Sequence, residues 1–543
     1  MRNGTYSENL VLNKSLLLIG ENAETTIVDG GPAGGWVLTI TADNITVTGF
    51  TLRSLAPTRN IGLGIYASNC NVSKNVITNN WGGIQLRGKS NILSENTVID
   101  NEHYGIEADS SSNNSILKNN VRGGIRLSDS SSNSLTENNC DGITLVFSSN
   151  NNNLTGNALV GGGLSIFSSF GTLAEDNSVN GKPLIYLEDA SGQLIEDAGQ
   201  VSLVSCKDML VRNLTNADIE LHGTNNTEIT ANHEVHVELF AGSNNNIITE
   251  NNECTIRLDS SSNNYIANNR ISNNSDGIYL AASWNNHISE NNVTTNDNGV
   301  RLLSSSNNTI SQNRITGSVY SGIDLSFSSN NNKITENNIS NNDIGVYLSY
   351  SSNGNNISGN SITENRKSGT TIGYRVPESV PEQGGCSANS VFENNIADNS
   401  CGIQIIYSSN TTVFHNNFEQ NNVQIYTDHS LSTCWDNGYP SGGNYWSSYT
   451  HVDENNGPNQ NITGPDGIWD HPYNLSASDV DHYPLVGRIT IPEFPSMLLL
   501  PIFILVTSLV VKVCRRRHFF SGHRTKPSAS ASIDRHVNPK SLA

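Results

Sequence analysis

The sequence predicts an all-β fold, a parallel β-helix solenoid, from a repeat and from the residues that fill it. A Gly followed by Ile, Leu or Val recurs about every 18 to 23 residues, as in other repeat architectures. Each repeat also holds a Ser-Ser-Asn-Asn-x-Ile phrase and a Glu-Asn-Asn phrase, as at 304–310 and 336–338. Short alternating segments between Gly or Asn turns are typical of strands. Three strands per repeat indicate coils stacked into a solenoid.

Asparagine fills the turns of this repeat, as in "SSNNNKITENNISNNDIGVYL" at 328–348. Asn, Ser, Gly and Thr are poor helix formers. Asn tolerates left-handed turns, and stacked Asn side chains can hydrogen-bond along a ladder. Ile334, Ile339, Val346 and Leu348 lie between the asparagines at spacings that suit inward-facing columns. We therefore interpret asparagine as scaffold and the aliphatic residues as core.

The composition limits the possible classes of protein. The 543 residues carry a formal net charge of -20 and are only 35% hydrophobic. A polar, acidic chain can be disordered, but disorder does not require a fixed period. The acidic balance also disfavours binding to nucleic acid, whose phosphates attract basic proteins. We therefore expect an ordered solenoid without a nucleic-acid partner.

Breaks in the period predict the domain organisation. The prolines in 366–389 cannot belong to a coil, so we expect a chain excursion there. The N-terminus looks truncated, because no signal peptide precedes the first repeat. The expected order is β-helix (1–180), inserted excursion (181–200), β-helix (201–430), C-terminal cap (431–487), linker (488–495), transmembrane helix (496–513) and basic cytoplasmic tail (514–543).

The cap is predicted from aromatic residues that gather where the period fades. Trp435, Trp446 and Trp469 lie there with several tyrosines. Large rings bury much surface in few residues. The open end of a solenoid needs such a cover, because an uncovered edge invites other chains to add to it.

The C-terminal region predicts a membrane anchor. Phe494 to Val511 is an uncharged stretch of 18 residues, long enough to span a thin bilayer as a helix. Arg515, Arg516 and Arg517 follow it, so we expect a cytoplasmic tail and a β-helix outside the cell. Asn-x-Ser/Thr sequons are frequent and permit glycosylation.

Two segments and the repeat itself suggest a family. The repeats resemble those of the right-handed β-helix family of NosD-like archaeal surface proteins, whose coils are shared with carbohydrate-binding proteins and sugar hydrolases. Residues 180–206 resemble the Gly-Lys-Pro insertion of NosD-like helices, and 435–449 with 481–487 resemble the closing segment of archaeal relatives. The resemblance implies a right-handed solenoid at the cell surface whose partners are polysaccharides or cell-envelope glycans.

The variable residue of each Gly-Ile-x-Leu phrase points outward and forms a column along one face. A solvated polar face is the plain explanation; a sugar-binding face is the alternative, because tyrosine rings stack on sugars and Arg binds their hydroxyl or acidic groups. The predicted ligand-binding residues are Arg257, Tyr279, Arg301 and Tyr347. Candidate catalytic carboxylates are Glu220, Glu238 and Asp324. Glu220 and Glu238 stack one coil apart, which is close to the carboxylate separation of a retaining glycosidase.

The sequence contains two candidate metal sites. Asp453, Asp466, Asp470, Asp479 and Asp481 crowd a Gly-rich segment and predict either a Ca²⁺ site or aspartates that serve turns. Copper would use histidines such as His222, His233 and His236. The three-residue offset of the last two places them on opposite faces of a regular strand, which disfavours copper.

Two function classes follow from the sequence. The first is a membrane-anchored, non-enzymatic surface protein that binds glycans or builds the cell envelope. The second is an extracellular polysaccharide hydrolase or lyase that uses the outward column.

Overall fold

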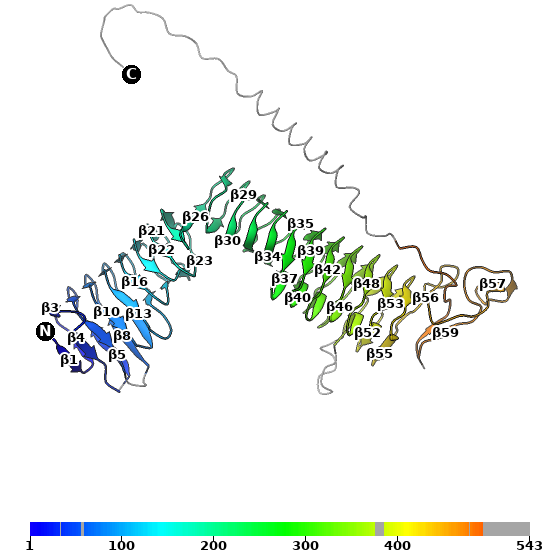
Figure 1. Cartoon of the computed structure of the whole chain (residues 1–543), viewed down its shortest axis with the longest axis horizontal. Coiled ribbons are helices and arrows are strands. Elements are labelled where there is room, and N and C mark those ends of the chain that lie inside the picture. The colour runs from blue at the N-terminus through cyan, green and yellow to red at the C-terminus, as the bar shows by residue number, and fades with distance from the viewer. Residues whose placement is uncertain (33, 56–58, 375–384, 477, 492–543) are drawn as a thin grey trace, which may run out of the picture. The chain divides into compact units, whose positions relative to one another are not determined.

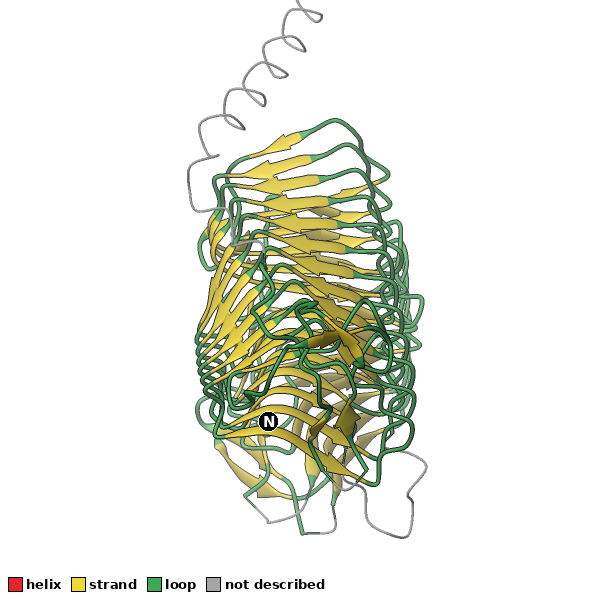
Figure 2. Cartoon of the chain, turned by 90° about the vertical axis from the view of Figure 1, so that its right-hand side faces the viewer, coloured by secondary structure: helices red, strands yellow, loops and turns green. Residues whose placement is uncertain are grey.

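A computed structural model describes residues 1–32, 34–55, 59–374, 385–476 and 478–491. Within these ranges the chain forms short β-strands and no helix, and nearly all strand pairs are parallel. Strands of successive coils lie side by side, rung upon rung (Figures 1 and 2). Columns of eight and eleven strands correspond to about 19 coils. The prediction of an all-β parallel solenoid is therefore confirmed.

In the first part, each coil contributes one strand to each of three sheets. The sheet made by the Gly-Ile phrases, here called the ladder sheet, contains β2 (Leu10–Leu12), β5 (Gly35–Ile40), β8 (Asn60–Ile65), β11 (Gly82–Leu86), β14 (Ile106–Asp109), β17 (Ile125–Ser128), β20 (Ile143–Val146) and β23 (Leu164–Phe167). The other two sheets run from β1 (Gly4–Ser7) to β25 (Ser178–Val179) and from β3 (Leu17–Ile19) to β24 (Leu173–Glu175).

The second part repeats this arrangement. Its ladder strands are β28 (Gln200–Val204), β30 (Thr215–His222), β32 (His233–Phe240), β34 (Asn252–Asp259), β37 (Asp276–Ala281), β40 (Asn298–Leu303), β43 (Ser321–Ser326), β46 (Ile344–Leu348), β49 (Ser368–Ile372), β52 (Cys401–Ile406) and β55 (Val423–Asp428). A second column runs from β27 (Leu194–Ile195) to β53 (Thr412–Phe414), and a third from β36 (Arg270–Ser272) to β56 (Tyr445–Trp446).

Aliphatic side chains fill the interior in columns. Val300, Ile323 and Val346 occupy the same position of successive coils, and all three are fully buried. Because side chains alternate along a strand, Asp324, next to Ile323, faces the other side of the sheet. This register places every variable ladder residue on the outer face.

Buried asparagines join the coils. The Oδ1 atom of Asn313 accepts hydrogen bonds from the backbone N–H (2.9 Å) and the Nδ2 (3.0 Å) of Asn291 in the preceding coil. Its Nδ2 donates to Asn337 Oδ1 (3.0 Å) in the next coil and to the Ile288 carbonyl (2.8 Å). The same ladder comprises Asn232, Asn251, Asn269, Asn291, Asn313, Asn337, Asn360, Asn394, Asn416 and Asn444.

The expectation of an excursion at 181–200 is wrong. Asn180 and Gly181 both have left-handed backbone angles, so the chain reverses in a tight hairpin there. The next strand, β26 (Lys182–Glu188), pairs antiparallel with β25 and then parallel with β28. The insertion is therefore built into the sheets. In the expected excursion at 366–389, residues 368–372 form β49, and 375–384 lie outside the described residues.

The side chain of Gln200 continues the ladder sheet across this junction. Its Oε1 accepts from the Leu164 N–H (2.7 Å) and its Nε2 donates to the Leu164 carbonyl (2.8 Å). Leu164 begins β23, the last ladder strand of the first part. One side-chain amide thus pairs with both backbone groups that a neighbouring strand would otherwise engage.

Residues 431–487 lie on the last coils. The Trp446 ring stacks on Phe418 with centroids 4.4 Å apart, and both rings are buried. Asn444 provides the final rung of the asparagine ladder. Two small hairpins follow, β57 (Asn455–Asn456) with β58 (Ile462–Thr463) and β59 (Tyr473–Asn474) with β60 (Val480–Asp481). The expected membrane helix at 496–513 lies outside the described residues, and no helix able to cross a bilayer occurs within them.

The asparagine ladder generates a stability prediction. Replacing Asn313 by Ala leaves the Asn291 N–H groups and the Ile288 carbonyl buried without a partner. Each orphaned buried group costs about 1–3 kcal/mol, so Asn313→Ala should lower the free energy of unfolding by several kcal/mol in denaturant titrations. The half-buried Asn338, in β45 (Asn338–Ser340), is the control. Asn338→Ala should change the free energy of unfolding by less than about 1 kcal/mol. Equal losses would contradict a ladder role.

Candidate functional site

The variable residues of the second part form one continuous outer column. Cross-strand pairing places Glu220 opposite Glu238, then follows the order Arg257, Tyr279, Arg301, Asp324, Tyr347, Thr371, Gln404 and Tyr426. Adjacent rungs of a sheet are about 4.8 Å apart. The structure thus brings all predicted ligand-binding and catalytic candidates into a single row.

The middle of this row presents hydrogen-bonding groups rather than ring faces. The Arg257 guanidinium lies over the Tyr279 ring, 5.0 Å from its centroid. Arg301 occupies the rung on the other side of Tyr279. Because the Arg257 guanidinium covers one face of this ring, a sugar cannot stack on that face of Tyr279. The guanidinium groups and the tyrosine edge remain available for hydrogen bonds.

Asp324 is more enclosed than an outward residue was expected to be. Only 7% of its surface is exposed. Burial raises the pKa of Asp324, while a hydrogen bond from the Ser326 hydroxyl and the positive charge of Arg301 act in the opposite direction. The Nε of Arg301 lies 3.3 Å from the Asp324 carboxylate, and Asp276 contacts the same guanidinium at 3.7 Å. Asp324 therefore holds Arg301 in place rather than meeting solvent.

Glu220 and Glu238 occupy neighbouring rungs but differ in environment. The Glu220 carboxylate accepts a hydrogen bond from Gln200 Nε2 (3.2 Å) and lies 3.4 Å from His222 Nε2. Burial is the main cause that raises the pKa of Glu238, and the nearby Glu220 charge adds to it. A carboxyl group whose pKa is raised can act as a general acid near neutral pH. Stacked acids held by neighbouring cations are the equally simple structural explanation.

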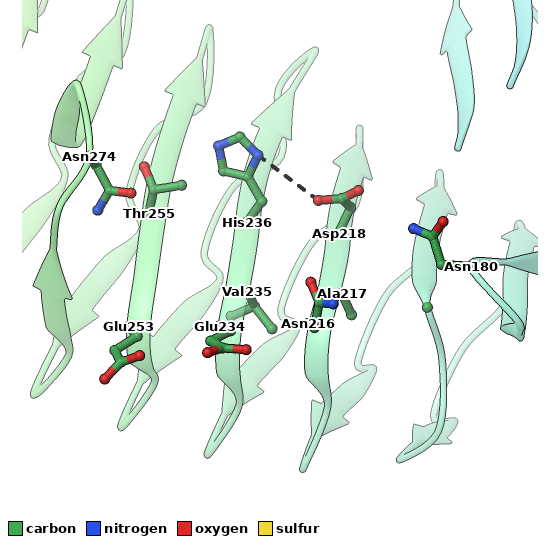
Figure 3. A pocket seen from close by; sticks show the side chains of 11 residues that line it. Asn180, Asn216, Ala217, Asp218, Glu234, Val235, His236, Glu253, Thr255 and Asn274 are labelled. Atoms are coloured by element: carbon green, nitrogen blue, oxygen red, sulfur yellow. Dashed lines mark ion pairs between the residues drawn. The ribbon is translucent and has the colours of Figure 1, made fainter. Parts of the chain in front are cut away.

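A groove of about 390 Å³ opens beside this acidic end of the row. The long strands β30, β32 and β34 line it, with Asp218, His236 and Thr255 at equivalent positions. Figure 3 shows the His236 ring facing Asp218, at 4.0 Å between Nδ1 and the carboxylate. Glu234 and Glu253 lie together on neighbouring strands at the opposite end of the groove (Figure 3).

Three residues at this groove could hold a metal ion. Among the described residues, His233, Glu234 and Glu253 form the group whose ligand atoms lie within 4.8 Å of one another. The Nδ2 of Asn252 lies 2.9 Å from His233 Nδ1. Rotation of this amide by 180° would place its Oδ1 there to accept the Nδ1 proton and leave Nε2 free to coordinate, as partners of metal-binding histidines do.

His233 and His236 do not follow the alternation of a regular strand, so the expectation that they lie on opposite faces is wrong. Glu234 has a left-handed backbone angle of 52°, so the regular alternation of β32 begins only after it. The side chains of His233 and His236 are 43% and 54% exposed, whereas Val235 and Val237 are buried. Both histidines therefore face solvent.

The five C-terminal aspartates do not converge on one point. Each carboxylate accepts hydrogen bonds from its own backbone or side-chain donors. Asp479 accepts from Trp435 Nε1 (3.0 Å) and Ser476 Oγ (2.6 Å), and Asp481 from Trp446 Nε1 (2.8 Å). The remaining three accept from turn N–H groups: Asp453 from Asp466 and Gly467, Asp466 from Ile468, and Asp470 from Glu454 and Asn455. Within the described part of the chain these five carboxylates accept hydrogen bonds from turn N–H groups, a serine hydroxyl and tryptophan N–H groups, as the turn alternative predicts.

The family model described as "Periplasmic copper-binding protein (NosD)" matches residues 175–371 and 320–451. The chain belongs to the NosD family. The model described as "Right handed beta helix region" matches residues 32–159, within the first part of this NosD-family solenoid. No curated protein matches the chain.

Solved structures similar to this NosD-family chain are distant. The periplasmic alginate epimerase AlgG is 13% identical, with 58% of this chain and 78% of that chain covered and a TM-score of 0.29. The PL6 family alginate lyase AlyGC is 12% identical, with 82% and 96% covered and a TM-score of 0.24. The Azotobacter vinelandii mannuronan C-5 epimerase AlgE6 A-module is 10% identical, with 80% and 89% covered and a TM-score of 0.19. No site residue is transferred from them.

Sequence reasoning missed the groove, although the repeat carried a signal for it. In most coils a Gly stands directly before the first core residue of the ladder strand, and at Gly277 a Cβ atom would lie 2.7 Å from the Gly299 carbonyl oxygen of the next coil. In three successive coils Asp218, His236 and Thr255 replace this Gly. Those coils have uninterrupted eight-residue strands, which leave room for side chains there. A polar residue in place of the repeated Gly marks the groove.

Proposed function

We propose that the chain is a non-enzymatic glycan-binding protein of the cell surface, and that the outer column of the second part binds a polysaccharide. The observation that carries this proposal is the row Arg257, Tyr279 and Arg301 on consecutive rungs. An extended polymer that runs along the solenoid meets a new hydrogen-bonding side chain at every rung, about 4.8 Å apart. Guanidinium groups bind sugar hydroxyls and, bidentately, sugar carboxylates.

Preorganisation supports this site. Asp276 and Asp324 hold the Arg301 side chain at 3.7 and 3.3 Å, and the Tyr279 ring supports Arg257. Side chains held in place before binding lose little conformational entropy when the ligand arrives. The alternative is a polysaccharide hydrolase or lyase in which Glu238 acts as an acid or base beside Glu220.

We also propose that the solenoid is extracellular and tethered by residues 496–513. The uncharged stretch and the arginines that follow it support this topology. A glycan-binding surface outside the cell has access to envelope polysaccharides.

A second candidate function is copper binding, the property named in the description of the matched family. The group His233, Glu234 and Glu253 favours it. One imidazole nitrogen and two carboxylate oxygens suit Cu²⁺, which accepts mixed N and O ligands. Two glutamates on neighbouring rungs repel each other, and a bound cation would relieve that repulsion.

The glycan proposal predicts selective loss of affinity. The full chain in detergent should bind at least one member of a panel of neutral and acidic polysaccharides in affinity electrophoresis. Arg257→Ala and Arg301→Ala should each weaken binding about tenfold or more, because each removes charge-assisted hydrogen bonds. Arg270 and Arg314 are exposed on the β36 column, so Arg270→Ala and Arg314→Ala are matched controls that should bind normally.

Two results would contradict this assignment. Equal loss in the ladder and control variants would place the binding site elsewhere. Release of reducing ends or of unsaturated sugars that disappears in Glu238→Gln would favour the enzyme instead.

The anchor predicts a fractionation result. The full chain should sediment with membranes and need detergent for release, whereas a chain ending at residue 487 should appear in the soluble fraction. The reason is that the deleted segment holds the uncharged stretch from Phe494 to Val511. Quantitative immunoblots of both fractions provide the measurement. Recovery of the full chain in the soluble fraction would contradict the proposed membrane anchor.

The copper candidate predicts a spectroscopic result. Cu²⁺ added to the full chain should give an electron paramagnetic resonance signal with nitrogen coupling, and His233→Ala should abolish it. His236→Ala, a change of the same residue type on the same strand, should leave the signal intact. Asp466→Ala should also leave it intact, because that carboxylate serves a turn. A signal that survives in His233→Ala would exclude this site.

A further inference from the structure

Large aromatic residues gather on the outer side of the ladder sheet in the first part, far along the chain from the row described above. Trp36 lies in β5, Tyr66 follows β8, Trp81 precedes β11 and Tyr104 precedes β14. These four coils are consecutive, and their ladder strands pair with one another. All four residues are partly buried. An outer sheet face that only needs to be soluble would not be expected to carry four such rings.

Glycines allow the rings to lie against the sheet. A Cβ atom on Gly82 would lie 2.5 Å from Tyr104 Cζ and 2.7 Å from its Oη, so the phenol ring lies across this glycine. A Cβ atom on Gly64 would likewise lie 2.6 Å from Trp36 Cδ1 and 2.9 Å from Tyr66 Cε2. A ring that lies over the backbone in this way turns its other face outward. Edge-to-face contacts join the rings in two pairs, Trp36 with Tyr66 at 5.4 Å and Trp81 with Tyr104 at 6.1 Å between centroids.

The cluster also holds polar atoms that the protein does not satisfy. Among the described residues, Trp36 Nε1, Trp81 Nε1 and Tyr104 Oη are buried without a hydrogen-bond partner. Only Tyr66 uses its hydroxyl, which donates to Gln85 Oε1 at 2.6 Å. Tyrosine and tryptophan normally find a partner when buried. Three unpaired groups in one cluster indicate that something outside the chain supplies partners after a small movement of the rings.

Charge selects among the possible partners. Two arginines of this face are in ion pairs, Arg87 with Asp109 at 2.8 Å and Arg126 with Glu107 at 3.8 Å. A third, Arg59, lies over the Trp81 ring, 5.9 Å from its centroid. An acidic sugar would have to draw Arg59 away from this ring or separate one of the ion pairs, whereas a neutral sugar needs no cation.

We propose that Trp36, Tyr66, Trp81 and Tyr104 form a second carbohydrate-binding surface, one that takes a neutral pyranose chain. The apolar C–H face of each sugar ring packs on the outward aromatic faces, and sugar hydroxyls pair with the indole N–H and phenol O–H groups. This surface goes beyond the arginine row, which is suited to hydroxyl-rich or acidic chains. Each surface can exist without the other.

The test uses tryptophan fluorescence of the full chain in detergent, titrated with cellohexaose, mannohexaose, xylohexaose and the acidic hexagalacturonate. At least one neutral hexasaccharide should give a saturable change and bind more tightly than hexagalacturonate. Tyr104→Ala should weaken it about tenfold, whereas Tyr104→Phe, which keeps the ring, should lose less. Trp284 is an exposed tryptophan of the second part, and Trp284→Ala should bind normally.

The outcomes separate this surface from the arginine row. Binding of a neutral hexasaccharide that persists in Arg257→Ala but is lost in Tyr104→Ala supports the aromatic surface. This holds whether or not the arginine row binds a glycan. Isothermal titration calorimetry of Trp36→Ala tests the same site without depending on tryptophan fluorescence. No response to any neutral hexasaccharide, tighter binding of hexagalacturonate, or unchanged binding in both Tyr104→Ala and Trp36→Ala would overturn the proposal.

Discussion

The hydrogen bond between stacked asparagines is the interaction on which the rest of the molecule depends. Each coil turns its chain through corners where backbone groups cannot pair with a strand. Buried asparagines such as Asn291 and Asn337 satisfy those groups and also bond to the coils before and after. A buried polar group that lacks a partner costs more than a hydrogen bond gains, so every rung must be filled. This requirement accounts for the unusual composition of the chain.

The scaffold separates stability from function. Inward columns such as Val300, Ile323 and Val346 and the asparagine corners fix the position of each coil. The outward residue between two core residues is then free to change, because its side chain does not affect the register. The chain can therefore place an acidic groove, an arginine row and an aromatic surface on one type of sheet.

The repeat made much of the structure predictable from sequence. Residues with a fixed period must stack, so the order from Glu220 to Tyr347 in the outer column follows from counting alone. Prediction failed where the period stops. The hairpin at Gly181 builds the insertion into the sheets, and the left-handed turn at Glu234 lets both His233 and His236 face solvent. Such turns depend on single backbone angles, which a side-chain pattern does not record.

The environments of individual ladder residues could not be read from the repeat either. Alternation correctly placed Asp324 on the outer face, yet the residue is buried, because burial depends on the neighbouring rungs as well as on its own strand. Arg301 and Asp276 surround it, and they come from coils one and two steps away. Likewise, whether a tyrosine ring can meet a sugar depends on the adjacent rung: Arg257 covers Tyr279, whereas Gly82 leaves space beneath Tyr104. In a solenoid, the chemistry of an outer residue is therefore set by its neighbours along the stack, and a binding surface is found by reading down a column rather than along the chain.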